Sequence, residues 1–169
     1  MWNLSNSEII AVSSVAIALL ALAATFWQAH ISRRHNRLSV RPFLEHREER
    51  IQGEHISVSI VNHGIGPALL EEVYFTVSPN TQRLDIDGLL DKIVLAMKPT
   101  KGAWECGTFS GKHVFPPGGI TTVVKLELTL EDDENFEIIN KILNDASIHI
   151  VYRSMYNELY RYSETLRLP

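Results

Sequence analysis

The sequence has very little cysteine: Cys106 is the single thiol in 169 residues. One thiol cannot close a disulfide within the chain and supplies too few ligands for a zinc ribbon or finger, so both kinds of small stapled fold are excluded. A surplus of positive charge is also missing, because 16 Lys and Arg residues stand against 20 Asp and Glu, for a formal net charge of -4. This balance argues against duplex nucleic acid as a partner.

The spacings of common catalytic and metal sites are missing as well. Seven histidines are scattered along the chain without an HExxH motif or a close pair, so we expect no metal. Gly64 and Gly66 precede a predicted strand and not a helix, which favours a turn over a phosphate-binding loop. We therefore expect neither an enzyme nor a cofactor-binding protein.

One long apolar segment is present near the N-terminus. Residues 9–27 run for 19 positions without a charged side chain, which is about 28 Å of helix. We predict a transmembrane helix over residues 9–29, with Trp2 and Trp27 at the two interfaces, where indole rings prefer to lie. No second run of this length follows, so we expect a single pass.

The charges around this segment predict its orientation. Glu8 is the only charged residue before it, whereas Arg33, Arg34 and Arg37 follow it within a basic juxtamembrane linker over residues 30–41. By the positive-inside rule, residues 1–8 are extracytoplasmic and residues 42–169 form a cytoplasmic domain. The same order of charges argues against a cleaved signal peptide.

The arginines after the span invite two interpretations. We expect them to contact anionic lipid headgroups, and a phosphorylated ligand is the alternative. The full basic cluster consists of Arg33, Arg34, Arg37, Arg41, Arg47 and Arg50.

Small residues recur along one face of the predicted span at spacings of three and four, and small faces let helices approach closely. The abundance of alanine in this segment offers chance as an alternative explanation. The stripe predicts helix association, and so a homo-oligomer, through Ala11, Ser14, Ala18, Ala21 and Thr25.

Residues 42–169 show the alternation of β-strands. Residues 55–62 alternate cleanly, and residues 69–77 form a second strand with a bulge at Glu71 and Glu72, so we expect an antiparallel pair joined by a glycine loop. Residues 120–130 predict the longest strand, with the even positions facing the core. Residues 147–154 and 159–167 predict a closing hairpin.

Two helices are predicted between these strands. One begins after Asp87 as its N-cap and stops before Pro99. The other follows the acidic run at residues 131–134, since negative charge is favourable at a helix N-terminus. About seven strands with two inserted helices predict a mainly β domain, an immunoglobulin-like sandwich or a small barrel.

The closing hairpin also offers the best candidates for ligand contact. Its tyrosines could stack on bases, and neighbouring arginines could meet phosphates. We therefore assign ligand binding to Arg153, Tyr160 and Arg161. The alternative is that the tyrosines fill a half-buried pleated surface.

In layout the chain resembles a loose group of small bacterial membrane-anchored proteins with an immunoglobulin-like domain. The resemblance rests on the single N-terminal span, the stretch Leu38-Ser39-Val40-Arg41-Pro42, the loop Asn62-His63-Gly64-Ile65-Gly66-Pro67-Ala68 and the Tyr-rich C-terminal hairpin. The organisation is also similar to membrane effectors of bacterial antiphage systems. In those proteins a cytoplasmic domain senses a cyclic oligonucleotide or a partner, and the membrane part damages the inner membrane.

Two functions follow as expectations. The first is an inner-membrane effector or sensor whose cytoplasmic domain binds a nucleotide messenger or a protein partner and drives oligomerisation of the membrane helices. A one-span protein cannot form a pore alone, so permeation would require several copies. The alternative is a constitutive adaptor that holds a protein partner at the inner membrane through an exposed strand edge.

Overall fold

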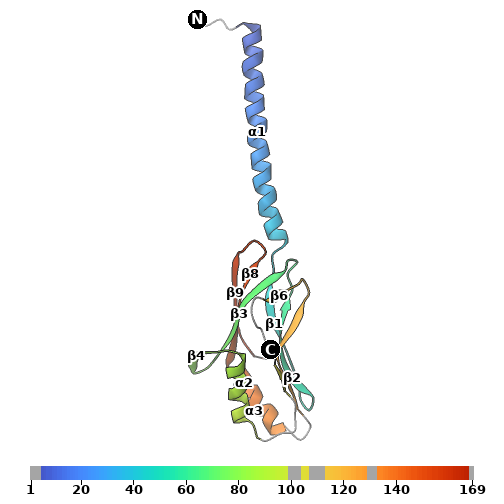
Figure 1. Ribbon diagram of the computed structural model, residues 1–169, viewed down its shortest axis with the longest axis vertical. Helices are drawn as coiled ribbons and strands as arrows, with labels where there is room; N and C mark the ends of the chain where they lie inside the picture. The colour runs from blue at the N-terminus through green and yellow to red at the C-terminus, as the bar shows by residue number, and fades with distance from the viewer. Residues whose placement is uncertain (1–4, 99–103, 107–112, 129–132, 168–169) are drawn as a thin grey trace. The chain divides into compact units, whose positions relative to one another are not determined.

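The computed structural model describes residues 5–98, 104–106, 113–128 and 133–167, and the chain divides into two units, Met1–Ser39 and Val40–Pro169. The first unit contains helix α1 (Asn6–Ser39) (Figure 1). Ser5 and Glu8 form a capping box, because the Ser5 amide donates to Glu8 Oε2 at 2.7 Å and the Glu8 amide donates to Ser5 Oγ at 3.4 Å. This helix is long and apolar enough to span a membrane, with a mean hydropathy of 2.5 over 18 residues.

Helix α1 continues beyond the predicted span. Residues 30–39 of the stretch predicted as a linker are helical. The physical reason is the lack of helix breakers, since no Pro or Gly lies between Gln28 and Ser39 and the first proline is Pro42. The arginines after the apolar run are therefore carried on a helix.

The second unit is built from two antiparallel sheets. Among the described residues, the first sheet has four strands in the order β1-β2-β7-β5 and the second has five, in the order β4-β3-β8-β9 with β6 also paired to β3. The strands are β1 (Leu44–Ile51), β2 (His55–Asn62), β3 (Ala68–Val77), β4 (Asn80–Leu84), β5 (Trp104–Cys106), β6 (His113–Phe115), β7 (Ile120–Glu127), β8 (Ala146–Ser154) and β9 (Leu159–Thr165).

Both sheets contribute to one hydrophobic core. Ile60 from the first sheet and Phe75 and Ile148 from the second are fully buried in it. Helices α2 (Ile86–Ala96) and α3 (Asp133–Asn144) bury Ile93 and Ile139 in the same core, at the end of the sheets away from the β8–β9 turn (Figure 1). The prediction of a mainly β, sandwich-like domain with two inserted helices is confirmed.

The strand count differs from the prediction of about seven. The described part of the chain has nine strands, because β4 and β6 are additional short strands of five and three residues on the same edge of β3. Strand β4 has the sequence NTQRL, which carries no apolar alternation. Strand β6 ends at Phe115, immediately before Pro116, so neither gives a strong local signal.

The predicted pairing of residues 55–62 with residues 69–77 is wrong. Strand β2 pairs with β1 and β7, whereas β3 pairs with β4, β6 and β8 in the other sheet. The loop between them crosses from one sheet to the other, so both strands bury their apolar faces against the common core. The predicted bulge in β3 is confirmed, since the register shifts between Leu70 and Glu72.

Two further predictions need correction. In β7 the register shifts opposite Val58 and Ser59, and this bulge buries both Val123 and Val124 while Ile120 is exposed. The even positions therefore do not all face the core. Helix α2 is capped by Asp85 and not Asp87, because the Asp85 carboxylate accepts a hydrogen bond from the amide of Gly88 at 2.8 Å. Residues 129–132, within the predicted strand end and acidic run, lie outside the described residues.

Candidate functional site

The three residues predicted to contact a ligand lie on the β8–β9 hairpin, but on two different faces. In the strand register Tyr160 lies opposite Tyr152, and Arg161 lies opposite Val151. Side chains alternate along a strand, so Tyr160 packs against the core while Arg153 and Arg161 lie on the outer face. The hairpin therefore brings the two arginines to one surface and separates them from the tyrosine.

The ring of Tyr160 is covered by other side chains. It stacks on Tyr152 with ring centroids 5.5 Å apart, and the guanidinium of Arg41 lies 4.8 Å from its centroid. Its hydroxyl donates to Glu158 Oε2 at 2.9 Å. Burial raises the pKa of Tyr160, and the bond to Glu158 raises it further. These contacts favour a packing role for this tyrosine over base stacking.

Arg153 lines a hollow of about 330 Å³ on the outer face, together with Leu69, Glu71 and Asn157. The guanidinium donates to Glu71 Oε1 at 2.6 Å and to the carbonyl and side-chain oxygens of Asn157 at 3.2 and 3.3 Å. Its charge is thus already balanced within the hollow. An anionic ligand would have to displace Glu71 to reach it.

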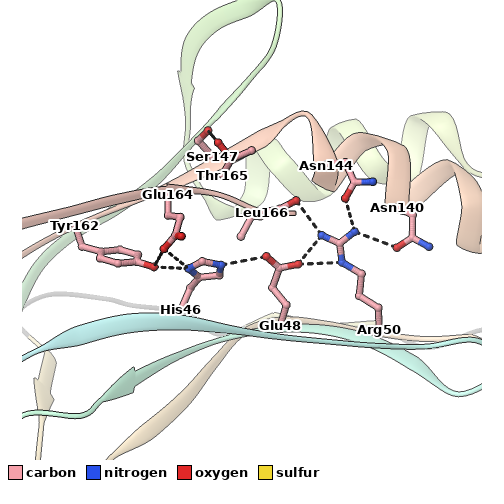
Figure 2. Close-up of polar contacts among 10 residues, drawn as sticks. All are labelled: His46, Glu48, Arg50, Asn140, Asn144, Ser147, Tyr162, Glu164, Thr165 and Leu166. Atoms are coloured by element: carbon pink, nitrogen blue, oxygen red, sulfur yellow. Dashed lines mark hydrogen bonds and ion pairs between the residues drawn. The ribbon is translucent and has the colours of Figure 1, made fainter. Parts of the chain in front are cut away.

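The densest set of buried charges lies instead between β1, β9 and α3, and Figure 2 shows its members pointing toward one another. Its centre is Arg50, whose side chain is only 1% exposed. The guanidinium donates to Glu48 Oε2 from Nε at 3.0 Å and from Nη2, to Asn140 and Asn144 from Nη1 at 3.2 and 2.8 Å, and to the Leu166 carbonyl from Nη2 at 3.0 Å. All five N–H donors of the arginine are therefore satisfied.

The network continues from Glu48 to the surface through His46 and Tyr162. Nε2 of His46 lies 3.1 Å from Glu48 Oε1, and Nδ1 lies 2.7 Å from the Tyr162 hydroxyl, which donates to Glu164. These contacts link the buried Glu48 to the exposed Glu164 through one histidine and one tyrosine.

Burial and hydrogen bonding shift two groups of this network. Burial raises the pKa of Glu48, but hydrogen bonds from His46 and Arg50 outweigh it and leave the pKa below its ordinary value of 4.5. Burial, followed by the bond to Glu164, raises the pKa of Tyr162. Glu48 therefore stays ionised and Tyr162 stays neutral, which are the states that these contacts require.

This network joins β1 to β9 and offers no free group for a reaction. We call it the lock. Strands β1 and β9 are each at the end of their sheets, and the network joins them side chain to side chain. Its central donors and acceptors are already bonded to one another, which leaves Arg50 no position for a substrate. Removing one partner of such a buried pair is costly, about 3–5 kcal/mol.

This burial corrects the interpretation of the basic cluster. Arg50 is enclosed in the network and cannot contact lipid headgroups, while Arg47 forms a surface ion pair with Glu49 at 2.7 Å. Strand alternation was the signal that could have found the β1 side of the network. His46, Glu48 and Arg50 fall on the same face as the buried Leu44.

The outer face of the second sheet carries a pair that superficially suggests catalysis. Ser163 Oγ lies 2.9 Å from Nδ1 of His149, and Nε2 of this histidine lies 3.0 Å from Thr76 Oγ1. In a hydrolytic triad the second ring nitrogen contacts a carboxylate, whereas here it contacts the hydroxyl of Thr76. Burial, and then the nearby Arg83, lower the pKa of His149, and its ring stacks on Tyr74 at 4.6 Å. These contacts describe a packed surface cluster.

The loop at residues 62–67 holds the first residues of the second unit in place, and we call it the clasp. The buried Asn62 donates from Nδ2 to the carbonyl of Gly66 at 2.9 Å, and its Oδ1 accepts from the amides of Phe43 and Gly64 at 3.2 and 3.0 Å. A Cβ on Gly66 would lie 1.7 Å from the Val40 carbonyl oxygen. The loop therefore closes over residues 40–43, the first residues of the second unit.

The predicted membrane residues lie along α1, apart from Trp2, which is outside the described residues. Trp27 is exposed, and Arg33, Arg34 and Arg37 occupy the last turns of the helix. In the predicted association stripe, the hydroxyls of Ser14 and Thr25 each donate to a carbonyl of the preceding turn at 2.8 Å, so both polar groups are satisfied within the helix. The stripe also contains Ala11, Ala18 and Ala21, which are exposed.

Within the described ranges, no three His, Cys, Asp or Glu side chains are placed to hold a metal ion. No protein-family model matches the chain, and no curated protein is significantly similar to it. Among solved structures, the chain is similar to a protein from Archaeoglobus fulgidus, with 9% identity over 75% of this chain and 98% of that chain and a TM-score of 0.23.

Proposed function

We propose that this protein is a single-pass effector or sensor of the bacterial inner membrane, acting in antiphage defence. In this proposal residues 1–8 are outside, and the immunoglobulin-like domain is cytoplasmic. Binding of a nucleotide messenger or a protein partner to this domain drives association of the membrane helices, and the assembly then perturbs the membrane without enzymatic chemistry.

The exposure of α1 carries the proposal. None of its 18-residue apolar window is buried within the chain. Leu20, Phe26 and Trp27 are among its side chains that are more than two thirds exposed. Apolar surface of this extent requires lipid or other helices around it. The sandwich already has its own core, so nothing in its fold depends on covering this helix.

The stripe of small residues supports association of copies. Its alanines can bring two backbones close together, and its two hydroxyls are bonded within their own helix. Ala16 lies on the opposite face of the same helix. It is two residues from both Ser14 and Ala18, which is about 160° around the helix axis at 100° per residue. The chain thus provides a matched pair of alanines for a test.

The test measures membrane potential with a voltage-sensitive dye in cells that express the full chain and are challenged with phage. We expect the potential to collapse on infection, and we expect Ala18→Ile to prevent the collapse because it obstructs close helix packing. Ala16→Ile makes the same change on the other face and should behave as the unaltered chain. A normal potential under every phage challenge would rule out the effector proposal.

A constitutive adaptor is the second candidate, because β9 is an end strand of its sheet and an end strand can accept another strand. The other sheet's end strand, β1, carries the exposed Arg47–Glu49 pair, and charges of this kind oppose edge pairing. An adaptor should retain a stoichiometric protein partner on purification in mild detergent from uninfected cells. Recovery of the protein alone would argue against this function.

A further inference from the structure

Exposed apolar side chains gather at one end of the sandwich. This apolar rim consists of Phe43, Ile65, Val114, Ile120, Met155 and Leu159, which are between 42% and 75% exposed. Among the residues that the structure describes, the opposite end has fewer such side chains, namely Ile51 and, on α2, Val94 and Leu95. Apolar side chains that cluster at one place on a domain mark a binding surface more often than scattered ones do.

Strand pairing places the members of the rim together. Leu69 lies opposite both Val114 and Arg153, and Arg153 lies opposite Leu159, so these residues form a row across the second sheet. Ser154, the residue before Met155, pairs with Ala68, just after the loop that carries Ile65. On the first sheet, Val61 pairs with Ile120, and the His63 amide donates to the Phe43 carbonyl at 2.8 Å.

The rim surrounds the point where the chain enters the sandwich. Gly64 and Gly66 pack against the backbone of residues 40–43, and Ile65 lies between these two glycines. In Figure 1 the β8–β9 turn lies at this same end of the two sheets. Val40 directly follows α1 in the chain, so the end of the sandwich that carries the rim is also the end tethered to the apolar helix.

We propose that the apolar rim docks on the headgroup layer of the membrane that α1 enters. This inference rests on the membrane anchoring proposed above. Twelve helical residues, 28–39, separate the apolar run from Val40, which is about 18 Å along a helix. The short connection keeps the rim at a high effective concentration near the lipid surface, where exposed aliphatic side chains leave water.

The arginines near the rim suit the same partner, and the nearby carboxylates of Glu71 and Glu158 are already bonded to Arg153 and Tyr160. Arg41 is exposed at the first residues of the sandwich, and Arg33, Arg34 and Arg37 lie between it and the apolar run. Arginine side chains bind lipid phosphates, while the apolar side chains enter the boundary between headgroups and acyl chains. A bilayer containing anionic lipid is therefore the occupant that matches both features.

The test uses single-cysteine variants of the full chain in a Cys106→Ser background. Ile65→Cys and Met155→Cys report on the rim, Leu95→Cys is an exposed apolar control at the opposite end, and Leu20→Cys reports on the apolar run. Each variant carries an environment-sensitive fluorophore in liposomes of phosphatidylcholine and phosphatidylglycerol. Quenching is measured with aqueous iodide and with lipids that carry a nitroxide on the headgroup or the acyl chain.

We expect headgroup nitroxide to quench both rim labels, with iodide quenching roughly threefold weaker there than at Leu95. The acyl-chain nitroxide should quench the label at position 20. Rim labels that behave like the label at position 95 would overturn the docking proposal while leaving the anchor intact. Rim labels shielded from both iodide and lipid quenchers would show a protein covering and would also overturn it. If no lipid quencher reaches position 20, the anchoring itself fails.

Discussion

Arg50 shows how one residue can join two sheets. Its guanidinium donates hydrogen bonds to acceptors in three parts of the chain. These are the Glu48 carboxylate on its own strand, the amide oxygens of Asn140 and Asn144 on α3, and the Leu166 carbonyl directly after β9. Only an arginine presents five donors in a planar fork that can be satisfied in this way. The stability of the domain should therefore depend strongly on this one side chain.

Arg50→Met should lower the free energy of unfolding by about 3–5 kcal/mol, because it leaves the carboxylate of Glu48 buried without its cationic partner. Urea unfolding of the full chain in mild detergent, followed by near-ultraviolet circular dichroism, measures this loss. Arg47→Met on the same strand removes an arginine that is 59% exposed and paired with Glu49, and it should cost no more than about 1 kcal/mol. Equal effects of the two substitutions would contradict the lock.

Glu48 should also make the unfolding free energy depend on pH. Its pKa in the folded protein lies below the ordinary value of 4.5, so the folded state favours the ionised carboxylate. The resulting stabilisation is fully present above pH 4.5 and is lost as the pH falls through the lower folded-state pKa. The difference in the free energy of unfolding between the original chain and Glu48→Gln should therefore be smaller at pH 3 than at pH 6. Unfolding curves measured between these two pH values test this. Glu49→Gln, which alters a half-exposed neighbour, is the control.

At the scale of elements, the loop at residues 62–67 does more than turn the chain. It carries β2 of one sheet into β3 of the other, and it closes over the backbone of residues 40–43 through the buried Asn62. Two glycines are required because backbone lies where their side chains would be: a Cβ on Gly64 would be 2.4 Å from the Phe43 nitrogen. The loop therefore couples sheet crossing to the position of the preceding segment.

Gly66→Ala should lower the free energy of unfolding by at least about 2 kcal/mol, because the added methyl group overlaps the Val40 carbonyl. It should also speed hydrogen exchange at the Phe43 amide, which donates to Asn62. Exchange measured by mass spectrometry over residues 40–44 reports this release. Ile65→Ala truncates an exposed side chain between the two glycines and should change stability by no more than about 0.5 kcal/mol; the clasp interpretation fails if exchange is unchanged in Gly66→Ala.

Local sequence patterns predict most of the elements but not how they combine. The bounds of β2 follow from clean alternation, and the closing hairpin follows from two alternating runs on either side of residues 155–158. The phase of β7 could not be predicted, because its bulge depends on pairing with β2. The network around Arg50 is harder still, since its partners on α3 and after β9 lie 90 to 116 residues away and strand alternation does not reveal which sheet edges meet.

At the scale of the whole molecule, the chain joins an apolar helix with no buried residue to a domain with its own core. The charges on the two sides of the apolar run are unequal. Glu8 precedes it, and Arg33, Arg34 and Arg37 follow it. Short basic flanks stay on the cytoplasmic side, so the sandwich should be cytoplasmic and the N-terminus outside.

Cysteine labelling with an impermeant maleimide tests this orientation in intact cells. In a Cys106→Ser background, Ser7→Cys should react and Ser163→Cys should react only after lysis, because the second position lies beyond the basic flank. Both residues are exposed in the fold, which makes their reactivities comparable once the membrane is opened. Labelling of position 163 alone in intact cells would place the sandwich in the envelope and would end the search for an intracellular trigger.

The lock between β1 and β9 also has a consequence for biosynthesis. The ribosome makes Glu48 and Arg50 soon after helix α1, but Asn140, Asn144 and Leu166 follow 90 to 116 residues after Arg50. Until then Arg50 has only Glu48 of its own strand as a partner, and contacts between such distant residues form slowly. Under the anchoring proposed for α1, the chain is held at the membrane before its domain can close, and a ribosome that stalls before residue 140 would leave an anchored, unfolded substrate for proteases.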